Sequence, residues 1–144
     1  MQVSVKKELR FEYAHRLFNY VGKCHNIHGH NEIVWVYFRR TDFFLNDIDM
    51  VIDFNDIKSG IGKWIDDNWD HSILLNKEDK KTIRAMEKLQ MKLYIMSGNP
   101  TAELIAHYLL HIVGPKYYSK TLNNLELYKV EVFENDFSVA VAEL

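Results

Sequence analysis

The sequence contains a single cysteine among its 144 residues, which excludes an intramolecular disulfide framework and fits a reducing compartment. It also lacks an excess of positive charge: 18 lysines and arginines against 20 acidic residues give a net charge of −2, so no nucleic-acid-binding surface is indicated. No apolar run approaches the roughly 18 residues of a membrane-spanning helix, and the first residues lack the apolar stretch of a secretion signal. We therefore expect a cytoplasmic protein without nucleic-acid or membrane partners.

The N-terminal residues alternate between apolar and polar side chains. The apolar ones fall at odd positions and are Val3, Val5, Leu9, Phe11 and Tyr13. A period of two predicts a half-buried strand over about 2–15. A second strand is expected over about 28–40, after a loop. Its run from Ile33 to Phe38 leaves neither face polar, which predicts cover by helices on one face and by another chain or a barrel interior on the other.

Two segments show helical spacing. In the first, apolar residues recur from Ile57 to Ile65, with Asn55 or Asp56 as the expected N-cap, although Gly60 and Gly62 weaken the pattern. A loop over 68–80, a short helical segment around 79–90 and an extended run over 93–96 are expected next.

The second helix is the clearer one. Asn99 is expected to cap it, Pro100 suits its first position, and Gly114-Pro115 should end it.

The chain closes with a predicted hairpin. Its strands run from Leu125 to Glu134 and from Phe137 to Glu143, on either side of Asn135-Asp136. We treat residues 1–144 as a single domain, because the length suffices for one core and no internal repeat is present. Two strands, two main helices and two strands predict an α+β fold: a four-stranded antiparallel sheet with both helices on one face (ββααββ).

Three histidines suggest a metal site. His28 and His30 are two residues apart on an extended chain and so point to the same face, with Gly29 allowing close approach between them. His15 continues the odd-numbered face of the first strand to its carboxyl end. If the two strands pair as a hairpin, all three imidazoles meet, and three protein ligands with one open position are typical of catalytic zinc. The plainer alternative is a buried core histidine and two solvated ones. Imidazole also suits iron, nickel and copper.

Three further residues could supply acid–base chemistry. Cys24 lies four residues before His28, and a cysteine near a metal can be a thiolate at neutral pH. Asp70-His71 could form a pair in which the carboxylate orients the imidazole. The alternatives are a small buried hydrophobe for Cys24 and ordinary loop polarity for Asp70 and His71.

Six ordered blocks resemble one known family. They are Phe11-x-x-Ala14-His15-x-Leu17, Gly22-Lys23-Cys24-x-x-x-His28-Gly29-His30-Asn31, Val51-x-Asp53-Phe54-x-x-Ile57-Lys58, Asp70-His71, Pro100-Thr101-x-Glu103 and Val132-x-Glu134. The chain is similar to the 6-pyruvoyltetrahydropterin synthase / 6-carboxytetrahydropterin synthase family over almost its whole length. The three residues between Cys24 and His28 resemble the bacterial 6-carboxytetrahydropterin synthases of queuosine biosynthesis, whereas the animal pyruvoyl enzymes have a longer spacer.

The resemblance implies a tunnelling fold, in which trimers close a twelve-stranded barrel and two trimers stack into a homohexamer. It implies that His15, His28 and His30 hold zinc and that Cys24 abstracts a proton from a pterin triphosphate substrate, 7,8-dihydroneopterin triphosphate. Further roles follow from the matched positions: Asp70 and His71 as a proton relay, Glu134 on the pterin N–H donors, Thr101 and Glu103 in the pterin pocket, and Arg16 and Lys23 on the triphosphate.

The expected activity is therefore that of a zinc-dependent lyase. It would form 6-carboxy-5,6,7,8-tetrahydropterin with loss of triphosphate and acetaldehyde. A 6-pyruvoyltetrahydropterin synthase and a non-catalytic, zinc-stabilised pterin-binding module are the alternatives.

Overall fold

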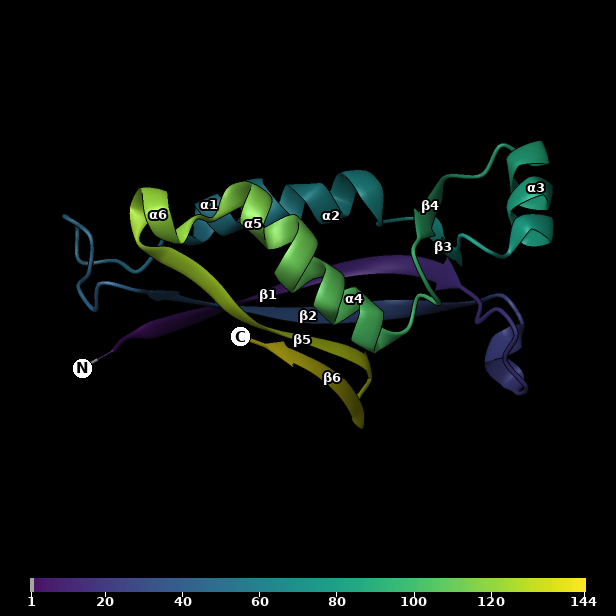
Figure 1. The fold of residues 1–144 in the computed structure, drawn as a ribbon, viewed down its shortest axis with the longest axis horizontal. Helices are drawn as coiled ribbons and strands as arrows, with labels where there is room; N and C mark the ends of the chain where they lie inside the picture. The colour runs from purple at the N-terminus through teal and green to yellow at the C-terminus, as the bar shows by residue number, and fades with distance from the viewer. Residues whose placement is uncertain (1) are drawn as a thin grey trace.

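The computed structural model describes residues 2–144, which form one curled six-stranded sheet with helices packed over one face (Figure 1). The strands are β1 (Ser4–His15), β2 (His28–Arg40), β3 (Ser72–Asn76), β4 (Leu93–Met96), β5 (Leu125–Asn135) and β6 (Ser138–Glu143), in the order β4-β3-β1-β2-β5-β6. The helices are α1 (Phe54–Ile57), α2 (Lys63–Asn68), α3 (Lys80–Lys88), α4 (Ala102–Tyr108), α5 (Gly114–Tyr117) and α6 (Lys120–Asn123), with a 3-10 turn at Lys23–His25. None of the helices described within residues 2–144 is long and apolar enough to cross a bilayer.

The four strands expected from the sequence, β1, β2, β5 and β6, pair antiparallel as predicted. The four-stranded antiparallel description is nevertheless incomplete, because β3 runs parallel to β1 and β4 runs parallel to β3. β3 lies in the segment predicted to be a loop. It buries Leu74 and Leu75 completely, but a strand of five residues shows no readable alternation, and its partner lies far away in sequence at Tyr13 to His15.

The first helix is confirmed and continues over 54–68, although Asp53 rather than Asn55 or Asp56 caps it. Asp53 Oδ1 accepts a hydrogen bond from the Asn55 N–H at 2.8 Å. The two glycines fall in a π-helical segment, Lys58–Gly62, between α1 and α2. A Cβ at Gly60 would lie 2.7 Å from the Tyr118 hydroxyl, so glycine allows a close approach that a longer side chain would prevent.

The second helix continues over 102–117 as α4, a π-helical segment (Leu109–Val113) and α5. Asn99 as its cap is wrong: the Thr101 hydroxyl accepts the Leu104 N–H at 3.2 Å. The predicted end at Gly114-Pro115 is also wrong, because Pro115 opens the turn that follows the π-helical segment. The wider turn changes the hydrogen-bonding pattern that a proline would otherwise break.

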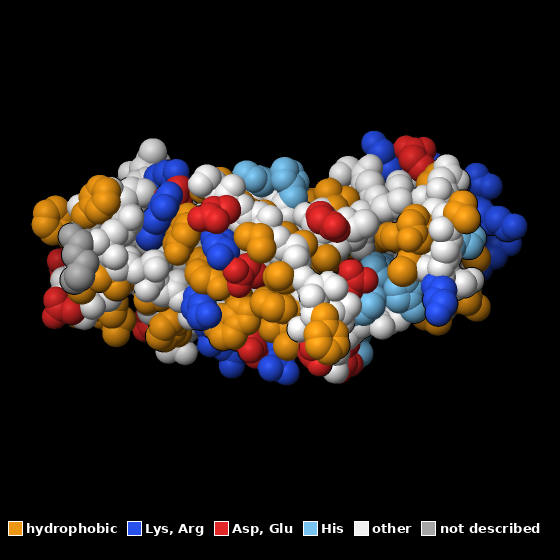
Figure 2. Space-filling model, turned by 90° about the horizontal axis from the view of Figure 1, so that it is seen from below, with side chains coloured by type: hydrophobic (Ala, Val, Ile, Leu, Met, Phe, Trp, Pro, Cys, Tyr) orange, Lys and Arg blue, Asp and Glu red, His pale blue; other side chains and the backbone are white. Residues whose placement is uncertain are grey.

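The core lies between the helices and the sheet and confirms the alternation in β1. The buried hydrophobic residues of the two central strands are Leu9, Phe11, Tyr13, Val34, Val36 and Phe38. The other face of β2 carries Trp35 and Tyr37, which are only partly buried within one chain, and Lys6 Nζ lies 4.5 Å from the centre of the Trp35 ring. Seen from below the sheet, apolar side chains gather among charged ones (Figure 2). The expectation that another chain or a barrel interior covers this outer face of β2 therefore remains a prediction.

Gly114→Ala tests the packing of the second helix on β5. A Cβ at this position would lie 2.6 Å from Leu127 Cδ2 and 3.1 Å from the Leu109 carbonyl oxygen. Alanine favours a helix over glycine by about 1 kcal/mol, whereas overpacking costs about 1–3 kcal/mol, so we expect a net loss of stability and a lower urea midpoint. The control is Gly98→Ala, whose Cβ would only touch Leu104 Cδ2 at 3.4 Å and should not lower the midpoint. A raised midpoint for Gly114→Ala would contradict the close packing.

Candidate functional site

The three histidines converge where the β1–β2 hairpin ends. The register places His15 opposite His28 and Tyr13 opposite His30, so all three imidazoles come from the same end of two paired strands. Their ring centres are 4.6 Å apart for His15 and His28 and 5.0 Å apart for each of the other two pairs. The predicted convergence is confirmed.

Two backbone carbonyls fix how two of these rings present their nitrogens. His15 Nδ1 donates to the Pro100 carbonyl at 2.6 Å, and His28 Nδ1 donates to the Asn26 carbonyl at 2.7 Å. With Nδ1 protonated, each neutral ring has a lone pair on Nε2, and these two Nε2 atoms are 3.0 Å apart. Two lone pairs that face each other at this distance repel, and a metal ion or a proton between them would relieve the repulsion.

Glu134, at the end of β5, is the fourth residue that lies beside His15, His28 and His30. Its Oε1 lies 3.5 Å from His30 Nε2, a buried nitrogen that has no hydrogen-bond partner among the described residues 2–144. One donor atom from each of His15, His28, His30 and Glu134 lies within 4.8 Å of all the others. Three imidazole nitrogens and one carboxylate oxygen are a donor set that fits a divalent metal ion.

Burial favours the neutral form of two of these histidines, His15 and His30. Desolvation is the main cause that lowers the pKa of His15 to about 4, and it also lowers the pKa of His30. Both rings are therefore unprotonated near pH 7, which is the form that binds metal.

Two polar residues next to the group were missed by the sequence reasoning. Glu32 is 1% exposed, and among residues 2–144 its carboxylate has no hydrogen-bond partner; the same holds for the buried Tyr13 hydroxyl. Burial is the main cause that raises the pKa of Glu32 to about 7. The available signal was that Glu32 is a charged residue at the same even-numbered spacing as Val34 and Val36, on the core face of β2.

Cys24 lies in the 3-10 turn Lys23–His25, next to the end of the hairpin. Its side chain is half-buried, and its carbonyl accepts the Leu17 N–H at 2.9 Å. This contact anchors the turn two residues beyond His15. The structure therefore places the cysteine near the metal-binding group, although not within it.

Asp70 and His71 form the pair expected from the sequence. His71 Nδ1 donates to Asp70 Oδ2 at 2.8 Å, and Asp70 Oδ1 accepts the Glu12 N–H at 2.9 Å. Partial burial opposes ionisation of Asp70, but the hydrogen bonds from Glu12 and His71 prevail and lower its pKa. His71 holds a left-handed backbone, with φ of 56°, and its N–H donates to the Glu12 carbonyl at 2.7 Å.

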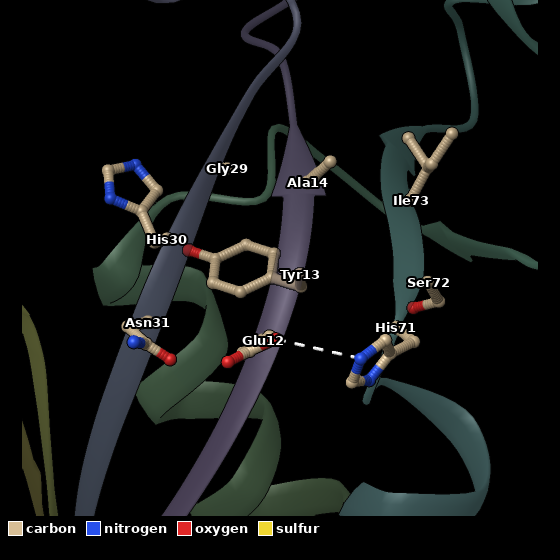
Figure 3. Close-up of a pocket in the computed structure, with 9 residues that line it drawn as sticks. All are labelled: Glu12, Tyr13, Ala14, Gly29, His30, Asn31, His71, Ser72 and Ile73. Atoms are coloured by element: carbon tan, nitrogen blue, oxygen red, sulfur yellow. Dashed lines mark ion pairs between the residues drawn. The ribbon is translucent and has the colours of Figure 1, made fainter.

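His71 borders an open hollow of about 450 Å³ beside β1, β2 and β3. Figure 3 shows the His71 ring directed toward Glu12, with Nε2 3.6 Å from Glu12 Oε2. The His71 side chain is 73% exposed, so in one chain it faces solvent. Water screens the electrostatic interaction between Asp70 and His71, so the exposed pair would be a weak proton relay in a single chain.

One chain does not bring His71 to Cys24. The His71 backbone is bonded to Glu12, whereas the Cys24 backbone is bonded to Leu17. From Glu12 to the end of β1 at His15 alone, the strand advances roughly 10 Å. The backbones of His71 and Cys24 are thus attached at separate positions of the chain, Glu12 and Leu17.

Of the remaining predicted site residues, Arg16 and Thr101 make structural contacts within the chain, and Lys23 and Glu103 are exposed. Arg16 lies 3.2 Å from buried Asp79 through Nε and donates to Thr82 at 2.8 Å, which ties the end of β1 to α3. Lys23 is exposed in the cysteine turn, and Glu103 is exposed in the first turn of α4, which Thr101 caps.

Comparison with known proteins identifies the family to which the chain is similar. A family model described as 6-pyruvoyl tetrahydropterin synthase matches residues 4–143. The chain is 35% identical over 133 residues to the 6-carboxy-5,6,7,8-tetrahydropterin synthase of Rickettsia felis, which spans 88% of this chain and 94% of that protein. It is 33% identical over 112 residues to the Haemophilus influenzae protein of the same name, across 74% and 79% of the two chains.

Solved structures share the fold. An uncharacterized protein from Wolinella succinogenes superposes with a TM-score of 0.80 at 20% identity, over 99% of this chain and 98% of that one. The 6-pyruvoyl tetrahydropterin synthase of Caenorhabditis elegans superposes with a TM-score of 0.71 at 22% identity, over 100% and 96%. Similarity at this identity establishes the fold, and the family model, which matches nearly every residue, establishes the rest: the chain belongs to the 6-pyruvoyl tetrahydropterin synthase family.

Proposed function

We propose that this protein is a zinc-dependent 6-carboxytetrahydropterin synthase. It converts 7,8-dihydroneopterin triphosphate to 6-carboxy-5,6,7,8-tetrahydropterin with release of triphosphate and acetaldehyde, in the cytoplasm, as a step toward queuosine. The observation that carries the proposal is the group of three histidines and Glu134 beside the turn that holds Cys24. Relatives up to 35% identical bear this name, and the three-residue spacing from Cys24 to His28 favours it over the pyruvoyl activity.

His15, His28 and His30 would hold the zinc, which when bound polarises the vicinal hydroxyls of the substrate side chain. Cys24 would remove a proton from the adjacent carbon, since cysteine can serve as a base or nucleophile in such a site. His71, oriented through Nδ1 by Asp70, keeps Nε2 available to exchange a proton on the opposite side of the substrate.

Glu134 would bind substrate rather than complete the metal's coordination. A catalytic zinc keeps one position open, and a carboxylate accepts two hydrogen bonds from the amidine-like edge of a pterin. Thr101 and Glu103 are proposed to border that pterin. Lys23 is the freer cation for the triphosphate, because Arg16 is already engaged by Asp79.

The separation of Cys24 from His71 supports a site shared between chains. We propose that trimers close a barrel in which His71 of one chain meets Cys24 of the next, and that two trimers form the homohexamer. Such contact would also exclude water from the exposed His71 ring, which strengthens the pairing with Asp70.

Cys24→Ala tests the activity. Wild-type protein with zinc and 7,8-dihydroneopterin triphosphate should release triphosphate, acetaldehyde and 6-carboxytetrahydropterin, detected by mass. The variant should lose at least about a thousandfold in kcat, since it lacks the base, while its zinc content stays at the wild-type value. His28→Ala is the matched control and should lose the zinc as well. Absence of product from zinc-loaded wild-type protein would refute the proposed function, and product without acetaldehyde would indicate the pyruvoyl activity.

Glu134→Gln separates the two roles open to this carboxylate. The amide keeps the size but loses one acceptor, so substrate binding should weaken by about tenfold or more, seen as a higher KM, while the zinc dissociation constant stays unchanged. A metal ligand would behave in the opposite way. Weaker zinc binding with an unchanged KM would show that Glu134 coordinates the ion.

Mixing two inactive variants tests the shared site. If chains of Cys24→Ala and His71→Ala assemble at random in one trimer, about a quarter of the sites combine an intact Cys24 with an intact His71. We expect activity to return to that fraction of wild type after co-expression. The control pairs Cys24→Ala with the Cys24→Ala/His71→Ala double variant and should remain inactive. No recovery in a mixture shown to contain mixed trimers would place the site within one chain.

A further inference from the structure

We propose that Asn99 is a positioning residue of the metal centre, because its side-chain amide fixes the Pro100 carbonyl that orients His15. The inference rests on the proposed metal centre and assigns a residue outside the donor group. The sequence suggests a different task for Asn99, that of a helix cap, but Thr101 performs it. The amide of Asn99 is therefore available for other contacts.

The Asn99 amide pairs with the backbone of Phe18 on both edges. Its Oδ1 accepts the Phe18 N–H at 2.8 Å, and its Nδ2 donates to the Phe18 carbonyl at 3.0 Å. This is the donor–acceptor pattern by which two neighbouring strands hold each other. Phe18 lies three residues after His15, so the pairing fixes the chain that leaves the metal centre.

A second contact ties Asn99 to β3. Asn76, the last residue of that strand, donates from Nδ2 to Asn99 Oδ1 at 3.0 Å. Both lone pairs of the Asn99 oxygen are then used, and an amide held by three hydrogen bonds cannot rotate without breaking them. Asn99 thus joins three segments that are distant in sequence.

The fixed position of Asn99 affects the proposed metal centre through the next residue, Pro100. The Thr101 N–H donates to the Asn99 carbonyl at 2.8 Å, which forms a tight turn around Pro100, and the proline ring fixes one of its two backbone angles. The Pro100 carbonyl is thereby held 2.6 Å from His15 Nδ1. That hydrogen bond selects the tautomer with a free Nε2 and fixes the direction of the ring.

The contacts form a closed loop. His15 bonds to Pro100 on one side, and Phe18 bonds to Asn99 on the other, so the end of β1 is attached twice to the same two residues. If the amide is removed, the hydrogen bond from His15 to the Pro100 carbonyl remains, but the second attachment, between Phe18 and Asn99, is lost. The ring would still be buried, but its Nε2 would be held in a less fixed direction.

Asn99→Ala, compared with Asn46→Ala, tests the inference by metal affinity. Asn46 is a matched control, because its Oδ1 also accepts two backbone N–H groups, from Ile48 and Met50, in the loop at the opposite end of the sheet (Figure 1). Partners of metal-binding histidines typically change affinity 10–100-fold, so we expect Asn99→Ala to bind zinc about tenfold more weakly in chelator competition. Its cobalt-substituted form should show an altered absorption spectrum, whereas Asn46→Ala should match wild type in both measurements.

Asn76→Ala keeps the test decisive if Asn99→Ala does not fold. It removes one of the three hydrogen bonds and should weaken zinc binding by a smaller factor, about threefold, again relative to Asn46→Ala. Unchanged zinc affinity and an unchanged cobalt spectrum in the folded Asn99 or Asn76 variant, even with a lower Tm, would overturn the inference. Failure of wild-type protein to bind zinc would instead refute the metal centre itself.

Discussion

The pairing of β1 with β2 is the constraint on which the rest of the structure depends. Its register sets His15 opposite His28 on the face that also buries Phe11 and Val34. A shift by one residue would turn every side chain of one strand to the other face, so it would expose the core and separate the histidines together. The hydrophobic effect that selects this register therefore also brings the metal donors together. The same pairing thereby places three imidazoles within reach of one ion.

This constraint explains why the sequence predicts the metal centre better than the rest of the fold. Alternation within β1 and the two-residue spacing of His28 and His30 are local, and they suffice once the two strands pair. β3 could not be predicted in this way, because its partner is distant in the chain and its five residues carry no period. Asn99 and Thr101 are both good capping residues, and only the path of the chain decides which one caps.

The residues proposed to be catalytic show a second limit of predicting a site from sequence motifs. Cys24 and the Asp70-His71 pair each match a family block, yet in one chain the pair bonds to Glu12 within β1, whereas Cys24 bonds to Leu17, two residues beyond its end. Matched blocks give the identity of residues and say nothing of whether one chain or two unite them. The exposed His71 ring and the half-covered outer face of β2 have the same explanation if neighbouring chains pack against this side of the sheet.

The position of β1 has a consequence for neighbouring subunits in the proposed assembly. The side chain of His15 contributes to the metal centre, whereas three residues earlier the backbone of Glu12 holds both Asp70 and His71. In a ring of subunits in which each His71 serves its neighbour, one rigid strand would contribute to two reaction centres at once. A small tilt of that strand on substrate binding would then reach the adjacent centre without any dedicated relay, so successive turnovers around the ring need not be independent events.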